Sequence, residues 1–184
     1  MQRISLTPKK VLFSAVLAIA MTLGLGMQTA HAQKLFFLFG HLAYENPGNN
    51  GIMQSYKYGI GGEVGGGIKL FNKTYATGTL GYSSFGQDKS ANPRPGRMSY
   101  VPVRFGLRQN FLPLNLLFLH ADVGTARVKN DLTSGSRFTG SFGVGGKLGP
   151  IEAQIDYELM GKKDADPKGG NGWVAFKAGW RFGL

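Results

Sequence analysis

A histidine and an aspartate two residues apart, His120 and Asp122, are the side chains in this sequence best suited to catalysis. Residues two apart on a β-strand share one face, so this imidazole and this carboxylate could share a hydrogen-bond network. A His–Asp pair can orient a nucleophile for acyl transfer. No serine stands beside the pair in a recognisable motif, so we expect a histidine held by Asp122 rather than an enzyme.

Metal and cofactor chemistry have little support in the sequence. The chain contains no cysteine, which excludes disulfides and thiolate metal sites. A metal site built from His41, His120 and Asp122 is a weaker interpretation than the hydrogen-bonded pair. We therefore expect no catalytic residue, no metal and no cofactor.

Charged residues alternate with apolar ones in several segments, which places the charges on one face of each expected strand. Glu152, Asp156 and Glu158 share such a face, and the next segment contributes Lys177 and Arg181. Buried charges persist only when they are paired and hydrogen-bonded, so we predict a cross-strand ion-pair network in a lumen. The residues predicted for this network are Lys57, Glu63, Lys69, Arg104, Arg108, His120, Asp122, Lys147, Glu152, Asp156, Glu158, Lys177 and Arg181.

The C-terminal segment, VAFKAGWRFGL, indicates what lies on the other face. Phe176, Trp180, Phe182 and Leu184 alternate with small or charged residues. Large aromatic side chains on one face and charges on the other suit a wall with lipid outside and a polar lumen inside. The spacing also resembles the C-terminal insertion signal of bacterial outer-membrane barrels, with Leu184 at the position where Phe is usual.

The elements that must position these residues are eight expected strands with period-two alternation. Their lengths are near the 9–11 residues or so of a tilted membrane strand. Long polar segments alternate with tight turns between them, which is typical of loops gathered at one end of a barrel. We predict an all-β fold, an eight-stranded antiparallel up-and-down transmembrane β-barrel. The expected strands are 35–44, 56–70, 75–85, 99–109, 116–128, 138–148, 151–159 and 173–184, and the first has no fixed phase because 35–39 is apolar throughout.

The state of the lumen is left open by the sequence. The interior of an eight-stranded barrel is just wide enough for side chains to fill. Long charged side chains could therefore plug it, which we favour, or line a narrow ion-conducting path. A soluble barrel with the same number of strands would instead place its apolar residues inside.

The N-terminal residues have the layout of a secretory signal peptide. Basic residues precede an uncharged apolar run over 11–27, and Ala-His-Ala offers a cleavage site after Ala32. We predict a signal peptide over 1–32 and a barrel domain over 33–184. The alternative is an uncleaved membrane anchor, although the run is near the lower limit for spanning a bilayer.

The chain is basic, with a formal net charge of +11, which favours an anionic membrane surface or lipid as its partner. Export makes nucleic acid the poorest candidate. The polar segment 86–98 carries Lys89, Arg94 and Arg97, which suit contacts with lipopolysaccharide phosphates. The plainer interpretation is a set of solvated loops.

Several segments resemble the outer-membrane protein beta-barrel domain family, the small OmpA/OmpX-like barrels often labelled the porin family. They are YVPVRFGLR from Tyr100, FGVGGKLGP from Phe142, IDYE from Ile155 and GWRF from Gly179. The resemblance implies a monomer in the outer membrane of a Gram-negative bacterium, folded by the barrel-assembly machinery and surrounded by outer-membrane lipid. It does not imply one activity, because fold and function separate.

We therefore expect a structural or surface-interaction role through extracellular loops, with an unknown surface ligand. The first alternative is a small pore or transport protein. The second is a lipid-modifying barrel enzyme that uses His120 and Asp122.

Overall fold

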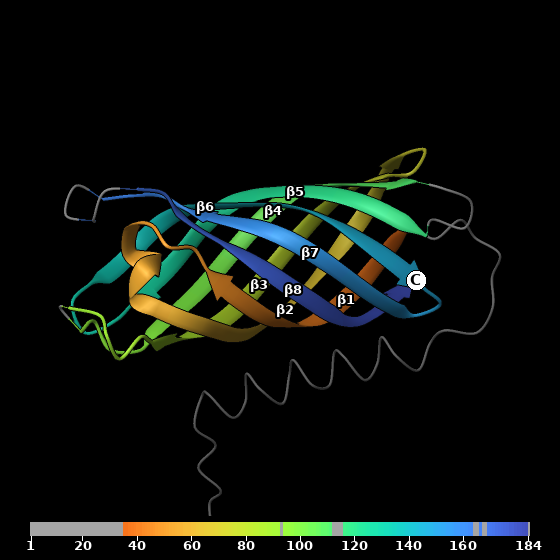
Figure 1. Ribbon diagram of the computed structural model, residues 1–184. Coiled ribbons are helices and arrows are strands. Elements are labelled where there is room, and N and C mark those ends of the chain that lie inside the picture. Colours follow the sequence, from red (N-terminus) through yellow and green to blue (C-terminus); the bar gives the residue numbers. More distant parts are fainter. Residues whose placement is uncertain (1–34, 93, 112–115, 164–165, 167–168, 184) are drawn as a thin grey trace, which may run out of the picture. The chain divides into compact units, whose positions relative to one another are not determined.

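The computed structural model describes residues 35–183, except 93, 112–115, 164–165 and 167–168. These residues form one closed barrel of eight antiparallel strands in sequence order, with the first strand paired to the last (Figure 1). The predicted fold class is confirmed, whereas the predicted signal peptide and Leu184 lie outside the described residues. The elements are β1 Phe36–Pro47, the 3-10 helix η1 Gly51–Ser55, β2 Tyr56–Phe71, β3 Thr74–Gln87, β4 Met98–Phe111, β5 Leu117–Lys129, β6 Ser134–Leu148, β7 Ile151–Met160 and β8 Asn171–Gly183.

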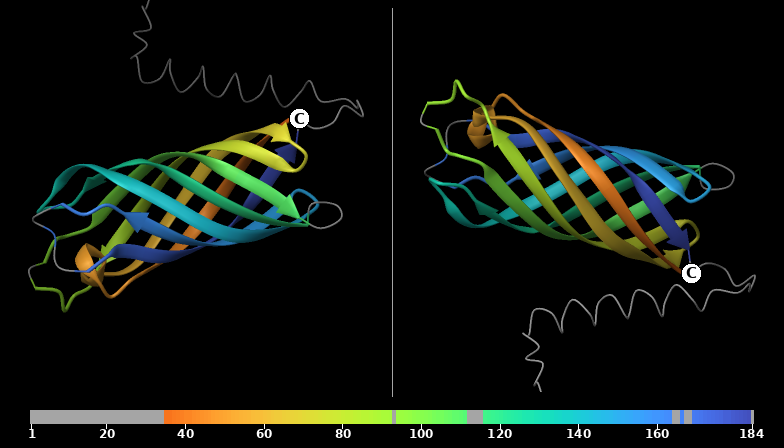
Figure 2. Two further views of the ribbon diagram at one scale, coloured as in Figure 1. Left: turned by 90° about the horizontal axis from the view of Figure 1, so that it is seen from above. Right: turned by 90° about the horizontal axis from the view of Figure 1, so that it is seen from below.

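The connections differ in length between the two ends of the barrel, as predicted (Figure 2). At one end, the turn end, β2 and β3 join through Asn72 (φ 44°), and β6 and β7 join through Gly149 (φ 59°). Tight turns require such left-handed backbone, which Asn and Gly tolerate. The opposite, loop end carries segments 48–55, 88–97, 130–133 and 161–170. The predicted loop 129–137 is shorter than expected because β5 and β6 continue pairing as far as Lys129 and Ser134.

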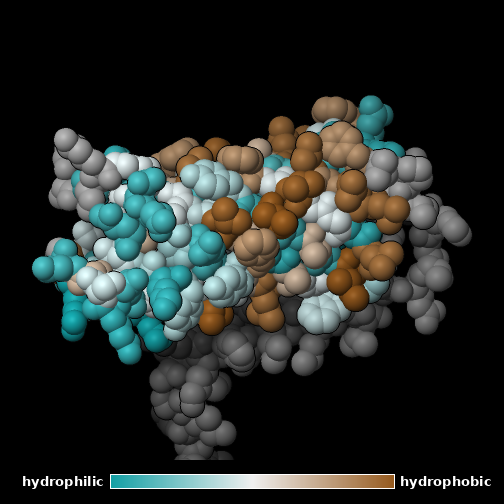
Figure 3. All heavy atoms as spheres, in the orientation of Figure 1, coloured by the Kyte–Doolittle hydropathy of each residue, from teal (hydrophilic) through white to brown (hydrophobic). Residues whose placement is uncertain are grey.

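The outward faces of the strands form an apolar belt around the barrel. Val123 is 57% exposed and Phe105 is 68% exposed, and brown side chains gather over the middle and the turn end in Figure 3. Aromatic side chains mark both borders of the belt, which is the layout of a membrane-spanning barrel. Those toward the loop end are Tyr44, Tyr58, Tyr82 and Tyr157, and those toward the turn end are Phe36, Phe71, Phe111, Trp180 and Phe182.

The glycines of β2 make room for aromatic rings in the lumen. A Cβ at Gly67 would lie 2.4 Å from the Phe37 ring, and one at Gly65 would lie 2.5 Å from the Phe39 ring. The two glycines face these phenylalanines in the β1–β2 register. The structure thereby fixes the phase of β1, in which Phe37 and Phe39 point inward.

The start of β2 departs from the predicted alternation. A register shift between Tyr56 and Tyr58 leaves Lys57 without a paired partner position on β3. Such a bulge changes the phase between the residues on its two sides. Tyr56 is therefore buried inside, and Lys57 and Tyr58 are both exposed. The prediction that Lys57 belongs to the lumen network is wrong for this reason.

Candidate functional site

The centre of the lumen is organised around the Lys177 ammonium group, which comes from β8. Its Nζ lies 2.9 Å from Glu63 Oε2, 2.8 Å from Asp156 Oδ2 and 2.8 Å from Glu158 Oε1. The three carboxylates come from β2 and β7, so one cation joins three strands. Lys177 is 4% exposed, which means that the protein supplies nearly all of its stabilisation.

A second cation, Arg104 of β4, extends this centre across the barrel. Its guanidinium donates to Glu158 Oε2 at 2.5 Å and to Glu63 Oε2 at 3.2 Å. The other oxygen of Glu63 lies 3.2 Å from His41 Nδ1. Glu63 therefore accepts from three strands at once, β1, β4 and β8. We call Glu63, Arg104, Asp156, Glu158 and Lys177 the central network.

Toward the turn end, two arginines stack against aromatic rings. Arg108 makes a bidentate pair with Glu152, at 2.6 and 2.8 Å, and its Cζ lies 3.4 Å from the centroid of the Phe118 ring. Arg181 Cζ lies 3.7 Å from the centroid of the Phe37 ring. Planar guanidinium groups suit both kinds of contact. This layer lies between the central network and the turn end of the barrel.

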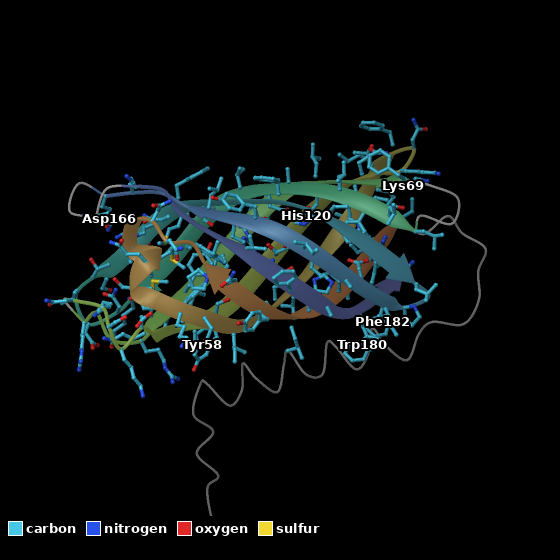
Figure 4. All side chains as sticks on the ribbon, viewed as in Figure 1. Tyr58, Lys69, His120, Asp166, Trp180 and Phe182 are labelled. Atoms are coloured by element: carbon cyan, nitrogen blue, oxygen red, sulfur yellow. The ribbon has the colours of Figure 1, made fainter. Side chains whose placement is uncertain are left out.

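His120 lies inside the barrel wall and is bound at both ring nitrogens (Figure 4). Nδ1 lies 2.7 Å from Asp122 Oδ2, and Nε2 lies 2.8 Å from Asp156 Oδ1. Thr77 donates to the other oxygen of Asp122 at 3.0 Å. A general base needs one nitrogen free to reach a substrate proton. In this arrangement carboxylates occupy both nitrogens, as in a structural bridge.

The loop end of the lumen is apolar. One buried cluster there, which we call the mouth cluster, contains residues of η1 and of six strands. Met53 of η1 is fully buried, so this short helix inserts a side chain into the barrel opening. The Trp173 ring packs edge-on against Phe85 and Tyr100, with centroids 5.4 and 5.1 Å away. The cluster is Met53, Tyr56, Phe85, Met98, Tyr100, Ala126, Val128, Met160, Trp173 and Ala175.

A polar junction above the mouth cluster ties two connecting segments to β6 and β8. Asp166 accepts two hydrogen bonds from the Arg137 guanidinium, one at 2.8 Å, and one from Asn171 Nδ2 at 3.2 Å. The Asn171 side-chain oxygen accepts from the Ile52 backbone N–H at 2.8 Å. Partial burial alone would raise the pKa of Asp166, but the bonds and charge of Arg137 and the Lys163 N–H outweigh it and lower the pKa. The junction holds η1 over the barrel opening.

Two small voids lie among the lumen side chains. A void of about 20 Å³ lies among Phe39, Glu63, Arg108 and Asp122, and another of about 10 Å³ lies near Glu45 and Tyr100. A cavity of roughly 10–15 Å³ is needed to hold one water molecule. Neither void is large enough for a hydrated ion.

Most of the predicted network residues lie together in the lumen. Lys69 and Lys147 are half-buried beside the short turns, outside the central network. Their strands end there, and Lys147 stands in register with Glu152. The residues whose contacts place them in the lumen are Glu63, Arg104, Arg108, His120, Asp122, Glu152, Asp156, Glu158, Lys177 and Arg181.

Sequence reasoning missed two lumen residues, His41 and Glu45. His41 bridges Glu63 and Glu152, at 3.2 and 3.5 Å, and Glu45 accepts from the Ser83 hydroxyl at 2.5 Å. The predicted first strand ends at Tyr44, but β1 continues to Pro47, so Glu45 lies on a strand. Both residues belong to the inward series 37, 39, 41, 43 and 45, which the sequence does not identify because it leaves the phase of β1 open.

The described residues contain no helix long and apolar enough to cross a membrane. Nor do they contain a group of three His, Cys, Asp or Glu side chains arranged to hold a metal ion. Lys89, Arg94 and Arg97 are all exposed at the loop end.

The chain matches no known protein-family model and no curated protein sequence. Solved structures do share its architecture. Neisserial surface protein A matches with a TM-score of 0.54 and 13% identity over 81% of this chain and 97% of its own. The N-terminal β-barrel domain of Pseudomonas aeruginosa OprF matches with a TM-score of 0.52 and 12% identity, over 79% and 97%. The protein is an eight-stranded transmembrane β-barrel.

A third match is the Yersinia pestis outer membrane protein Ail in a phospholipid bilayer nanodisc, with a TM-score of 0.50 and 15% identity over 79% of this chain and 99% of its own. Identities at this level establish a shared fold only. In the transmembrane barrel, the apolar belt faces lipid and the ion pairs lie in the lumen.

Proposed function

We propose that this protein is a bacterial outer-membrane barrel with a closed lumen, which acts as a structural or surface-interaction protein through its extracellular loops. In this proposal residues 1–32 are a signal peptide cleaved after Ala32. The barrel-assembly machinery reads Phe176, Trp180, Phe182 and Leu184 as the insertion signal, and the folded protein is a monomer surrounded by outer-membrane lipid and lipopolysaccharide.

The observation that carries the closed lumen is the continuity of its filling. Arg108 and Arg181 stack on aromatic rings at the turn end, the central network follows, and the mouth cluster fills the loop end. The two voids between these layers have room for about one water molecule each. Conduction would require several buried ion pairs to separate together, each at a cost of several kcal/mol.

Single-channel recording in planar bilayers tests the closed lumen. Wild-type protein that has passed a boiled-versus-unboiled gel shift should give no reproducible conductance steps. Arg104→Ala is the informative variant, since it removes the cation that joins Glu63 to Glu158. Regular steps from the wild type that disappear or change size in Arg104→Ala would establish the pore alternative instead.

The surface role is assigned to the loops because a rigid barrel presents them to the outside. Lys89, Arg94 and Arg97 are exposed on the segment between β3 and β4, where they could contact lipopolysaccharide phosphates. When all three residues are replaced by Ser, the yield of folded barrel should be unchanged but binding of the protein to phosphorylated lipopolysaccharide should fall. Unchanged binding would show that this segment is only a solvated loop.

The proposal excludes a hydrolytic role for His120, whose two nitrogens are bound to carboxylates. Labelled phospholipid and lipid A should remain intact when incubated with the refolded barrel. Turnover that is lost in His120→Ala would reverse this conclusion.

A further inference from the structure

Two cations stand on the outer wall of the barrel rather than in a loop or in the lumen. Arg127 and Lys129 are exposed, and both belong to the outward-facing series of β5 that begins with Leu117, Leu119 and Ala121. Neither makes an ion pair within the described part of the chain. They differ in this from Lys177 and Arg104, which form ion pairs inside the barrel.

Hydroxyl groups flank both cations on the neighbouring strands. Lys129 stands in register with Ser99 of β4 and Ser134 of β6, and Arg127 stands in register with Ser136 of β6. Residues in register on one face lie about 4.5–5.5 Å apart at Cβ. These serines therefore place hydroxyl donors beside the two charges. We call Arg127, Lys129, Ser99, Ser134 and Ser136 the rim patch.

The rim patch borders the apolar belt directly. Thr125, two residues before Arg127, is in register with Val103 and Phe138, and Phe138 is 61% exposed. Two residues along a strand span about 6.6–6.8 Å. The guanidinium group of Arg127 thus lies at headgroup depth immediately above side chains that contact acyl chains. Arg and Lys near a membrane end extend their charge to this depth.

The electrostatics of this wall are one-sided. Asp122 is the only acidic residue in β4, β5 and β6, and it faces the lumen. Asp131, a loop acid, lies two residues beyond Lys129 along the chain, farther from the belt. By contrast, the exposed Lys57 on β2 has a carboxylate near it, because its charge helps to lower the pKa of Asp88. Among the described residues, no carboxylate lies within ion-pair distance of either cation of the rim patch.

We propose that the rim patch binds the phosphate group of an acylated outer-leaflet lipid, whose acyl chains lie on the adjoining apolar belt. Arg supplies paired N–H donors to phosphate oxygens, and Lys supplies a point charge. A lipid satisfies the cations and the belt together, whereas a soluble anion would contact only the cations. This inference rests on the proposed outer-membrane location, and it names a lipid contact separate from the loop cations Lys89, Arg94 and Arg97.

Native mass spectrometry of the refolded barrel titrated with lipid A tests the proposal. Each cation near a membrane surface contributes about 1 kcal/mol, so Arg127→Ser with Lys129→Ser should weaken binding by roughly tenfold or more. The matched control, Lys57→Ser with Lys162→Ser, removes two exposed charges elsewhere and should stay within about threefold. The charge-preserving pair Arg127→Lys with Lys129→Arg should retain most of the affinity.

A second titration separates phosphate recognition from simple acyl contact. Lipid A with its phosphates removed should bind the wild type no better than it binds the Arg127→Ser, Lys129→Ser variant. Equal affinity for both forms of the lipid, or equal losses in the variant and its control, would overturn the rim patch. A gel shift on every variant first establishes a folded barrel. A wild type that shows no shift, or that is recovered outside the outer membrane, would refute the proposed function instead.

Discussion

Removing the shared cation of the lumen should be among the most damaging single changes in this protein. In Lys177→Met, the carboxylates of Glu63, Asp156 and Glu158 lose a partner that lies 2.8–2.9 Å from each. All three are less than a tenth exposed, so water cannot replace it. Removing one member of a buried ion pair costs about 3–5 kcal/mol. With three carboxylates affected, we expect the upper end of that range, a large share of a domain stability of about 5–15 kcal/mol.

The free energy of unfolding can be measured by urea titration in lipid vesicles, followed by the gel shift and by tryptophan fluorescence. Lys57→Met is the control, because Lys57 is exposed and surface changes usually stay within about 0.5 kcal/mol. Adding Glu158→Gln to Lys177→Met should recover part of the loss, since it removes one of the three negative charges that then outnumber Arg104 in the central network. A Lys177→Met barrel within about 1 kcal/mol of the wild type would refute the reasoning, because it would mean that water reaches the central network.

Three further predictions concern the wall, the mouth and the loop junction. Val123→Arg, in the middle of the lipid-facing wall, should lower the free energy of unfolding by about 2–4 kcal/mol in the same urea titration. Thr125→Arg, nearer the rim, should lower it by less, and equal losses would contradict the assigned depth. Met53→Ala should lower the free energy of opening η1 by about 2–5 kcal/mol. The expected sign is faster amide hydrogen exchange at 51–55 while the amides of β7 stay protected. Unchanged exchange would show that Met53 does not hold η1 in place. Because the pKa of Asp166 is lowered in the folded protein, its junction is fully stabilising above the usual Asp pKa and weakens as pH falls through the lower, folded value. Protection of the 161–171 amides from hydrogen exchange should therefore persist down to about pH 4 and fall below it. Asp166→Asn should show weak protection with little pH dependence.

The strands and their faces were predictable because the two environments of a barrel wall differ so strongly. Lipid outside and paired charges inside force the period-two pattern that is visible at Glu152, Asp156 and Glu158. The pattern fails where both neighbours of a residue are apolar, as in β1. There the inward positions of Phe37 and Phe39 depend on the glycines opposite them in β2, and such pairing is not visible in the β1 segment alone.

The loop end was less predictable, for a different physical reason. Above the membrane the outside of the wall is wet, so inward positions can be apolar and outward positions polar, which reverses the pattern found lower on the same strand. Val128 is buried in the mouth cluster while Lys129 is exposed, whereas Asp122 is buried and Val123 is exposed. The bulge at Tyr56–Tyr58 adds a second break that leaves no periodic signal.

The charged lumen itself needs a physical reason, because packed apolar side chains could fill the same space at equal or better stability. A chain exported across the inner membrane, as proposed here, must avoid long segments that are apolar throughout. A run of 18 or more apolar residues would be read as a membrane helix. Polar residues at alternate positions prevent this, and once the barrel closes they must be paired. The central network then follows from the export route and from barrel closure, with no need for conduction or catalysis. A barrel whose central network is replaced by well-packed apolar residues should therefore still refold in vitro, and a failure to refold would contradict this account.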